Sequence, residues 1–188
     1  MNLDPSDFSS QSSPKPQPGL CQNLVAVLEN PTFIINIGHV IRNVNGLGVE
    51  WLYVVDPDHR LEDDPMQLKN RKSLLKHSSA AVKWTQIRRF DTSEDCFEYL
   101  EREGFESLVT SPHQKGKNNT VLHEGTYLQP KLAVWFGNES KGISDLAIAR
   151  SSGCIQIGMY GQVESLNLAT TTGIVLHEVT RQRREKLA

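Results

Sequence analysis

Short apolar runs alternate with amphipathic helical patterns along most of this chain, and this alternation constrains the fold more than any other feature. Strands are predicted near Leu24–Leu28, Trp51–Val55, Val82–Ile87, Ser107–Thr110, Leu132–Phe136 and Cys154–Ile157. Helices are predicted near residues 37–47, 66–76, 93–103 and 144–150, with a last helix from about 165 to 185. Strands that alternate with helices are typical of an α/β domain, with a mainly parallel sheet and helices on both of its faces.

The chain length favours one folded domain preceded by a short tail. Of the 188 residues 38% are hydrophobic, which is enough to build a buried core. Residues 1–20 are predicted to be a disordered N-terminal tail because they are rich in Ser and Pro and contain few large apolar side chains. Residues 21–188 would form the domain. No signal peptide and no run of ~20 apolar residues is found, so a cytoplasmic protein without membrane contact is expected.

The charge of the chain limits how it could bind nucleic acid. A net charge of -2 and a pI near 6.3 exclude binding through bulk electrostatic attraction alone, so any RNA contact must be local. Two basic clusters could supply such contacts, or could be solvated helix faces. Their members are Lys69, Arg71, Lys72 and Lys76 in mid-chain, and Arg181, Arg183, Arg184 and Lys186 near the end.

The first helix carries a candidate functional arginine. Asn36 is predicted to cap the start of this helix, and Gly48 to end it. At 100° per residue the apolar side chains share one face, whereas Gly38 and Arg42 lie on the opposite face. Arg42 is therefore expected to point away from the core, and the small Gly38 one turn earlier would leave space for a ligand or another chain.

The last helix is predicted to begin at Ser165 and to pack closely against a neighbour. Small and apolar residues recur on it at helical spacing, at Ala169, Thr172, Gly173 and Leu176. This stripe suits contact with another part of the fold or with a second subunit, and the spacing does not choose between the two.

Two polar segments follow predicted strands. The strand Leu132–Phe136 ends in Gly137-Asn-Glu-Ser-Lys-Gly, before a helix that Ser144 would cap. The segment 157–167 runs from the last strand into a Ser165-x-Asn167 pair. In open α/β sheets ligands bind at the carboxyl ends of parallel strands, so both segments are candidate site loops.

Other common sites lack their sequence signals. The chain contains no dinucleotide-binding G-x-G-x-x-G after a strand, no phosphate-binding P-loop and no hydrolase G-x-S-x-G elbow. Its histidines show no metal-ligand spacing, so no metal is expected. Cys21, Cys96 and Cys154 are odd in number and scattered, which argues against a disulfide framework, and Cys154 is predicted to lie buried in a strand.

Three ordered segments resemble the motifs of the SpoU (TrmH-type) RNA 2'-O-methyltransferases, and the likeness extends over about residues 23–184. They are N-I-G-H-V-I-R from Asn36, F-G-N-E-S-K-G-I-S from Phe136, and I-Q-I-G-M-Y-G-Q-V-E-S-L-N, which ends at Asn167. Gly158 stands where the family usually has Pro, which would loosen the third segment. The resemblance implies a SPOUT-type domain with a C-terminal trefoil knot, working as a homodimer.

The resemblance also implies a cofactor, a substrate and site residues. S-adenosyl-L-methionine would bind at Gly137, Ile157 and Leu166, with Met159 nearby, and its methyl group would go to a ribose 2'-OH of RNA, with tRNA preferred over rRNA. The implied catalytic positions are Asn36, Arg42, Glu139, Ser165 and Asn167.

The role of Arg42 stays open at this point. The family proposal makes this arginine the base, whereas a guanidinium that stays protonated favours binding phosphate and stabilising developing charge. Two further classes remain as alternatives: a catalytically inactive knotted RNA-binding protein, and a binding module for a small nucleotide-like ligand.

Overall fold

The computed structural model describes residues 21–187, and the predicted disordered tail lies outside this range. The chain forms one seven-stranded sheet in the order β3-β2-β1-β6-β4-β7-β5, and every pairing between these described strands is parallel. The strands are β1 (Cys21–Glu29), β2 (Val49–Val55), β3 (Gln86–Phe90), β4 (Glu106–Thr110), β5 (Asn119–Val121), β6 (Leu132–Phe136) and β7 (Gly153–Gln156). The predicted parallel α/β fold is confirmed.

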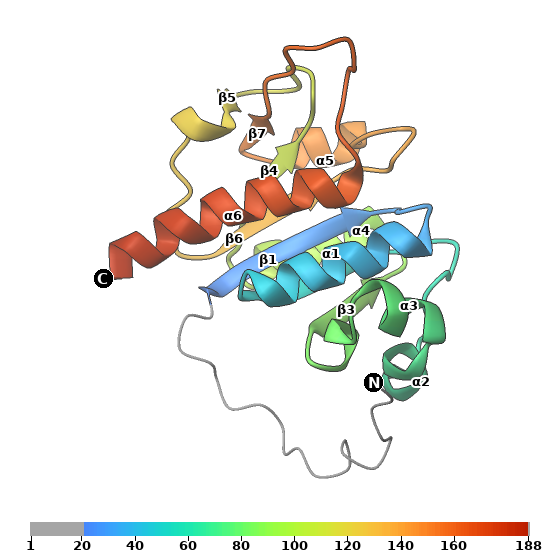
Figure 1. Cartoon of the computed structure of the whole chain (residues 1–188). Coiled ribbons are helices and arrows are strands. Elements are labelled where there is room, and N and C mark those ends of the chain that lie inside the picture. The colour runs from blue at the N-terminus through green and yellow to red at the C-terminus, as the bar shows by residue number, and fades with distance from the viewer. Residues whose placement is uncertain (1–20, 188) are drawn as a thin grey trace.

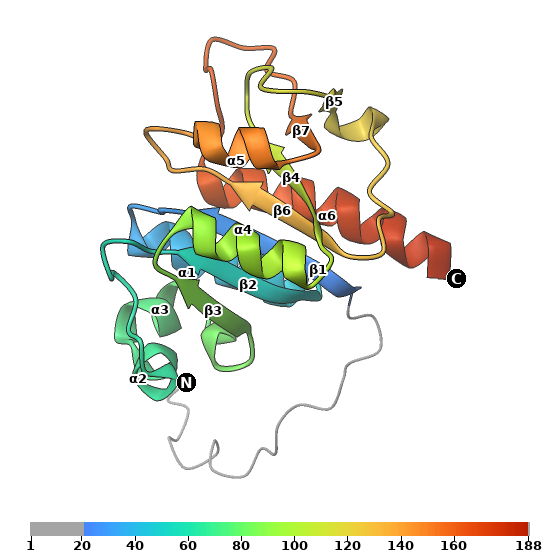
Figure 2. The same ribbon diagram turned by 180° about the vertical axis from the view of Figure 1, so that it is seen from behind.

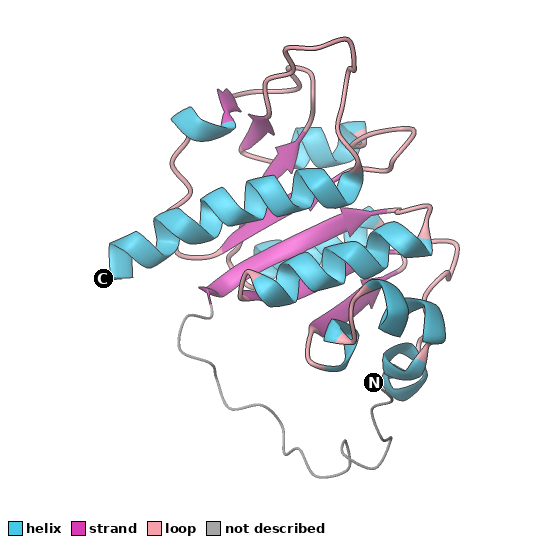
Figure 3. Cartoon of the chain, in the orientation of Figure 1, coloured by secondary structure: helices cyan, strands magenta, loops and turns pink. Residues whose placement is uncertain are grey.

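Helices cover both faces of the sheet, as predicted. They are α1 (Ile34–Gly46), α2 (Pro65–Asn70), α3 (Lys72–His77), α4 (Ser93–Arg102), α5 (Asp145–Arg150) and α6 (Leu168–Leu187), with 3-10 turns η2 (Ala81–Lys83) and η3 (Leu122–Glu124). On one face α1 and α6 lie side by side, with α3 next to α1 and α2 next to α3 (Figure 1). On the other face lie α4 and α5 (Figure 2). Figure 3 shows these helices flanking the central strands.

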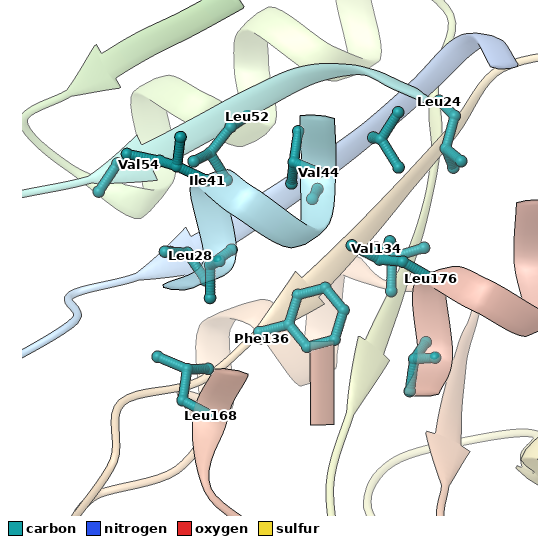
Figure 4. Close-up of a cluster of buried hydrophobic side chains, with 14 of the residues drawn as sticks. Leu24, Leu28, Ile41, Val44, Leu52, Val54, Val134, Phe136, Leu168 and Leu176 are labelled. Carbon is teal, nitrogen blue, oxygen red and sulfur yellow. The ribbon is translucent and has the colours of Figure 1, made fainter. Parts of the chain in front are cut away.

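The alternation of side chains along the strands divides the core into two layers. Leu24 and Leu28 of β1 pack toward α1 and α6, together with Phe136 and Leu176 (Figure 4). Val25 and Val27 point to the opposite face and pack with residues of α4 such as Phe97. A strand buried on both faces reads as a continuous apolar run, which is why β1 and β6 were visible in the sequence.

Several predicted boundaries were wrong. The helix predicted over 66–76 is broken at Arg71, whose extended backbone (φ -63°, ψ 116°) separates α2 from α3. The strand predicted at Val82–Ile87 is a 3-10 turn followed by β3, and the predicted start of the last helix at Ser165 lies three residues before α6. The three-residue strand β5 was not predicted, since so short a segment carries little periodicity.

The first helix also begins earlier than predicted. Its N-cap is Phe33, whose side chain makes no capping hydrogen bond, so the assignment of Asn36 as the cap was wrong. Gly48 does follow the helix, with φ +68°, a conformation that favours glycine. The space expected beside Gly38 is absent, because a Cβ placed on Gly38 would lie 2.6 Å from His77 Cβ of α3. Gly38 therefore permits helix packing within the chain.

The cysteines behave as predicted. Cys21, Cys96 and Cys154 are buried and free, and Cys154 lies in β7. Burial raises the pKa of the Cys154 thiol. Among the helices within residues 21–187, none combines the length and apolar character that crossing a bilayer requires.

Candidate functional site

A pocket in the described structure lies where β6 and β7 end and α1 and α6 begin. Its volume is about 760 Å³, and residues from all three candidate motifs line it. Of the predicted site residues it brings together Asn36, Gly137, Glu139, Ile157, Met159, Ser165, Leu166 and Asn167. Parallel strands place their carboxyl ends at one edge of the sheet, so segments far apart in sequence meet there.

A chain of three side chains joins the motifs. The Asn36 amide donates a hydrogen bond from Nδ2 to Glu139 Oε1 (2.9 Å), and its Oδ1 accepts one from Asn167 Nδ2 (3.1 Å). Asn167 Oδ1 in turn accepts from the backbone N–H of Ala169 (2.8 Å) and so caps α6. Both polar ends of the Asn36 side chain are thereby fixed, which orients this amide at the pocket wall.

Glu139 anchors the β6–α5 loop to the start of α1. Besides Asn36, its carboxylate accepts hydrogen bonds from the backbone N–H groups of Thr32 (2.8 Å) and Phe33 (3.2 Å). Burial alone would raise the pKa of the Glu139 carboxyl, but these donated hydrogen bonds outweigh burial and hold the pKa below its ordinary value of 4.5. Glu139 is therefore ionised at neutral pH, and its geometry suits orientation of Asn36 better than proton abstraction.

This anchoring predicts a pH-dependent contribution to stability. Replacing Glu139 with Gln removes an acceptor oxygen and should lower the free energy of unfolding by roughly 1–3 kcal/mol. A carboxyl with a lowered pKa stabilises the fold above its unfolded pKa, and this contribution disappears as the pH falls through the folded value. In urea unfolding, the difference in unfolding free energy between wild type and Glu139→Gln should be constant at pH values above 4.5, the ordinary pKa of this carboxyl. The difference should shrink at lower pH. Equal unfolding free energies of wild type and Glu139→Gln at pH 7 would contradict the anchoring role. Glu98→Gln, at an exposed position, is the matched control.

The β6–α5 loop is itself tightly built. Asn138 donates from Nδ2 to Asn30 O (2.6 Å) and to Thr32 Oγ1 (2.9 Å), and it exchanges backbone hydrogen bonds with Gly142. A Cβ placed on Gly137 would collide with the backbone of Gly142 and Ile143, so position 137 requires glycine. The loop thus presents backbone groups to the pocket at fixed positions.

The other end of this loop is held by a buried carboxylate. Glu29 at the end of β1 is 5% exposed and accepts hydrogen bonds from Ser144 N (2.8 Å) and Ser144 Oγ (2.6 Å). Ser144 also caps α5 as predicted, since its hydroxyl accepts from Ala147 N. Asn138 and Glu29 were not identified from the sequence, because the importance of each depends on contacts more than 100 residues away.

The segment 157–167 closes the other side of the pocket. Ile157, Met159 and Leu166 are partly buried, whereas Ser165 is exposed at the pocket wall. The Ser165 hydroxyl makes no hydrogen bond to another residue within 21–187, so it is available to a ligand. Gly158 lies close to Tyr160, and a Cβ there would be 3.0 Å from the Tyr160 hydroxyl.

Arg42 does not lie in this pocket. It is exposed, as predicted, and lines a second, shallower groove between α1 and α6. The other lining residues of this groove are Asn43, Gly46, Leu47, Gly173, Ile174 and His177. Within residues 21–187 the Arg42 guanidinium forms no ion pair. Because Arg42 does not line the pocket, a single chain does not bring it together with the other candidate catalytic residues.

The small-residue stripe of the last helix packs inside the chain. Asn43 of α1 donates from Nδ2 to Ala169 O (2.7 Å) and to Thr172 Oγ1 (3.1 Å), and Gly173 leaves room for the same side chain. Thr172 and Leu176 are fully buried. Contact with another part of the fold, one of the two options that the spacing left open, is therefore confirmed for these positions.

The two basic clusters differ in how far their charges are engaged. Near the end of the chain, Arg181 pairs with Glu178 and Glu185, and Arg183 donates to backbone oxygens such as Gln129 O. In mid-chain Arg71 pairs with Glu62. Lys69, Lys72 and Lys76 have no partner among residues 21–187, so α2 and α3 hold the freer positive charge.

The fold and the pocket define a parallel α/β protein with a candidate ligand site, which is lined by residues of three motifs at the carboxyl ends of the strands. Residues 23–177 match the model of the SpoU rRNA Methylase family. Because this match extends over most of the chain, the protein belongs to the SpoU family.

Similar proteins include enzymes that modify tRNA. The tRNA (guanosine(18)-2'-O)-methyltransferase of Thermus thermophilus is 28% identical over 161 residues, which are 86% of this chain and 76% of that enzyme. A solved structure of a protein studied for the 2-OH methylation of C/U34 on tRNA has a TM-score of 0.72 to this chain and is 26% identical to it. The match covers 86% of this chain and 97% of that one. The SpoU methyltransferase AviRb from Streptomyces viridochromogenes, solved with AdoMet, shares the fold at a TM-score of 0.72 and 22% identity, over 96% of this chain and 62% of that one.

Proposed function

We propose that this protein transfers a methyl group from S-adenosyl-L-methionine to a ribose 2'-OH of RNA. The observation that carries the proposal is the Glu139–Asn36–Asn167 network, which brings the three SpoU motifs to one pocket wall. Family membership supplies the reaction class. The network and the free Ser165 hydroxyl favour an active enzyme over the inactive RNA-binding alternative, and the family match disfavours a small-ligand binding module.

The pocket suits this cofactor in size and chemistry. Its volume of about 760 Å³ falls within the range of small-molecule sites. Ile157 and Leu166 offer apolar contact for an adenine ring, and the glycine-bearing loop at Gly137 offers backbone donors and acceptors. No side-chain phosphate clamp is needed, which agrees with the absence of a P-loop.

Positioning would provide much of the rate. The bound cofactor supplies an electrophilic methyl group on a positively charged sulfur. The ribose oxygen attacks this carbon in line with the breaking bond, and the hydroxyl proton leaves to solvent water. Asn36, held by Glu139 and Asn167, would orient the ribose, and Ser165 is free to donate a hydrogen bond to it. Arg42 would hold the neighbouring phosphate and stabilise the developing alkoxide charge.

Arg42 can serve this site in a homodimer. Because Arg42 lies outside the pocket of its own chain, we assign the arginine of each site to the partner subunit's Arg42. The α1–α6 groove, with Ile174 40% exposed, supports a self-complementary interface in this region. We also propose that the chain has the trefoil knot that the family resemblance implies, formed where the chain after β7 is threaded past the β6–α5 loop.

A homodimer predicts a defined mass and a defined point of disruption. Light scattering should give about twice the chain mass of 21.1 kDa. Ile174→Glu should shift the mass toward one chain without unfolding, because it places a charge in the groove between α1 and α6. Met66→Glu, at a 67% exposed position on α2, is the matched control and should remain dimeric. A wild-type monomer at micromolar concentration would remove the shared-site model.

The substrate that we propose is tRNA, in preference to rRNA, on the strength of the tRNA-modifying relatives. The low net charge implies that docking relies on local groups, for which Lys72 and Lys76 of α3 are available. Methyl transfer to undermodified total tRNA, compared with undermodified rRNA at equal nucleotide concentration, tests this choice.

A further inference from the structure

An exposed aromatic ring stands at the rim of the pocket where the fold does not require one. Phe33 is 58% exposed and occupies the N-cap position of α1. This position favours Ser, Thr, Asp or Asn, whose side chains can cap the helix, and the Phe33 side chain makes no such hydrogen bond. The Phe33 ring therefore does not cap the helix, and more than half of it lies outside the core.

The backbone that carries this ring is fixed. The Phe33 N–H donates to Glu139 Oε1 (3.2 Å), and the Phe33 carbonyl accepts from Ile37 N (3.2 Å). Phe33 thus shares its anchor with Asn36, whose amide also binds Glu139 Oε1. Both side chains line the pocket, so the ring is held at a set position relative to the network.

The chemistry of the substrate places a base beside this ring. In a nucleotide the base is attached to the ribose carbon adjacent to the one that bears the 2'-OH. A ribose bound at Asn36 therefore carries its base to the neighbouring pocket rim. Among the Phe, Tyr and Trp residues within 21–187, Phe33 and Phe136 line the pocket, and Phe136 is only 1% exposed.

We propose that Phe33 is a stacking platform for the base of the target nucleotide, and that the substrate is a nucleotide that is unpaired in the RNA. This inference rests on the proposed function. Single-stranded RNA is commonly bound by stacking bases on aromatic side chains. Stacking tolerates every base because each has a π-face, so Phe33 contributes affinity for an unpaired nucleotide with little base preference.

The test compares variants at position 33 on an undermodified total tRNA transcript pool. Phe33→Ala should raise the KM for RNA by about 5- to 150-fold, the effect of losing one stacked base, with kcat changed much less. Phe33→Tyr keeps a π-face and should retain near-wild-type KM. Phe33→Leu keeps apolar bulk without a π-face and should resemble Phe33→Ala. Trp84→Ala, which removes another exposed aromatic (42%) outside the pocket lining, should leave KM unchanged.

Four results would overturn the assignment. Phe33→Leu with wild-type KM would show that apolar contact suffices, and a loss of cofactor affinity or of the dimer in Phe33→Ala would show a structural role. Equilibrium binding of the same transcripts separates this inference from the proposed function. If wild type transfers no methyl group, weaker binding by Phe33→Ala than by Trp84→Ala still supports stacking, and equal binding contradicts it.

Discussion

Arg42→Ala should lower single-turnover methyl transfer by about 100- to 1,000-fold, corresponding to the ~2.7–4 kcal/mol lost when one donor to a transition-state oxyanion is removed. Arg42 is exposed and lies outside the pocket, so folding and cofactor affinity should stay near wild type. Arg42→Lys should rescue little, because an ammonium group lacks the planar fork that grips a phosphate and a ribose oxygen together. Labelled transfer to undermodified RNA, alongside a calorimetric cofactor titration, measures both quantities.

Mixed dimers provide the control for this prediction. Arg42→Ala and Ser165→Ala affect different halves of a shared site, so a heterodimer of the two variants contains one site with both changes and one site with neither. Mixing the two variants should therefore give more activity than either variant has alone. If mixing restores none while the subunits exchange, each site draws on a single chain. Wild-type transfer by Arg42→Ala would remove Arg42 from the mechanism.

Gly137→Ala should abolish measurable cofactor binding and lower the free energy of unfolding by about 1–3 kcal/mol, the usual effect of overpacking. The added Cβ would collide with the backbone of Gly142 and Ile143, which cannot move as a flexible side chain could. The loop that lines the pocket must therefore shift. Calorimetric titration with S-adenosyl-L-methionine and urea unfolding measure the two effects.

Gly161→Ala is the matched control, because it adds the same methyl group in the segment 157–167. A Cβ at Gly161 meets nothing within 4 Å. Its cofactor affinity should match wild type. If Gly137→Ala bound the cofactor as tightly as Gly161→Ala, the pocket would have been placed at the wrong strand end.

Much of the fold was predictable from the sequence because burial on both faces leaves continuous apolar runs. β1 and β6 lie at the centre of the sheet, and their runs predicted both strands. The edge strand β3 was displaced in the prediction, since its side chains are only partly buried and its apolar signal is weak. Strand order and the pairing of α1 with α6 depend on contacts between distant residues, which periodicity does not encode.

The candidate site was predictable in its members and not in its arrangement. Asn36, Glu139 and Asn167 were identified by resemblance, and the structure joins them in one network. The role of Asn36 could not be deduced from spacing, because this residue looked like a helix cap. The separation of Arg42 from the pocket was equally invisible, since helical periodicity gives the direction of a side chain but not what lies opposite it.

The most direct test of the central claim locates the transferred methyl group on the nucleotide. Wild-type protein is incubated with labelled S-adenosyl-L-methionine and undermodified tRNA, and the product is hydrolysed with alkali. Alkaline cleavage requires a free 2'-OH, so a 2'-O-methylated nucleotide protects the phosphodiester bond that follows it. We expect the label in alkali-resistant dinucleotides, with the signal lost in Arg42→Ala. Label in mononucleotides would mean that a base is methylated, and this result would contradict ribose methylation.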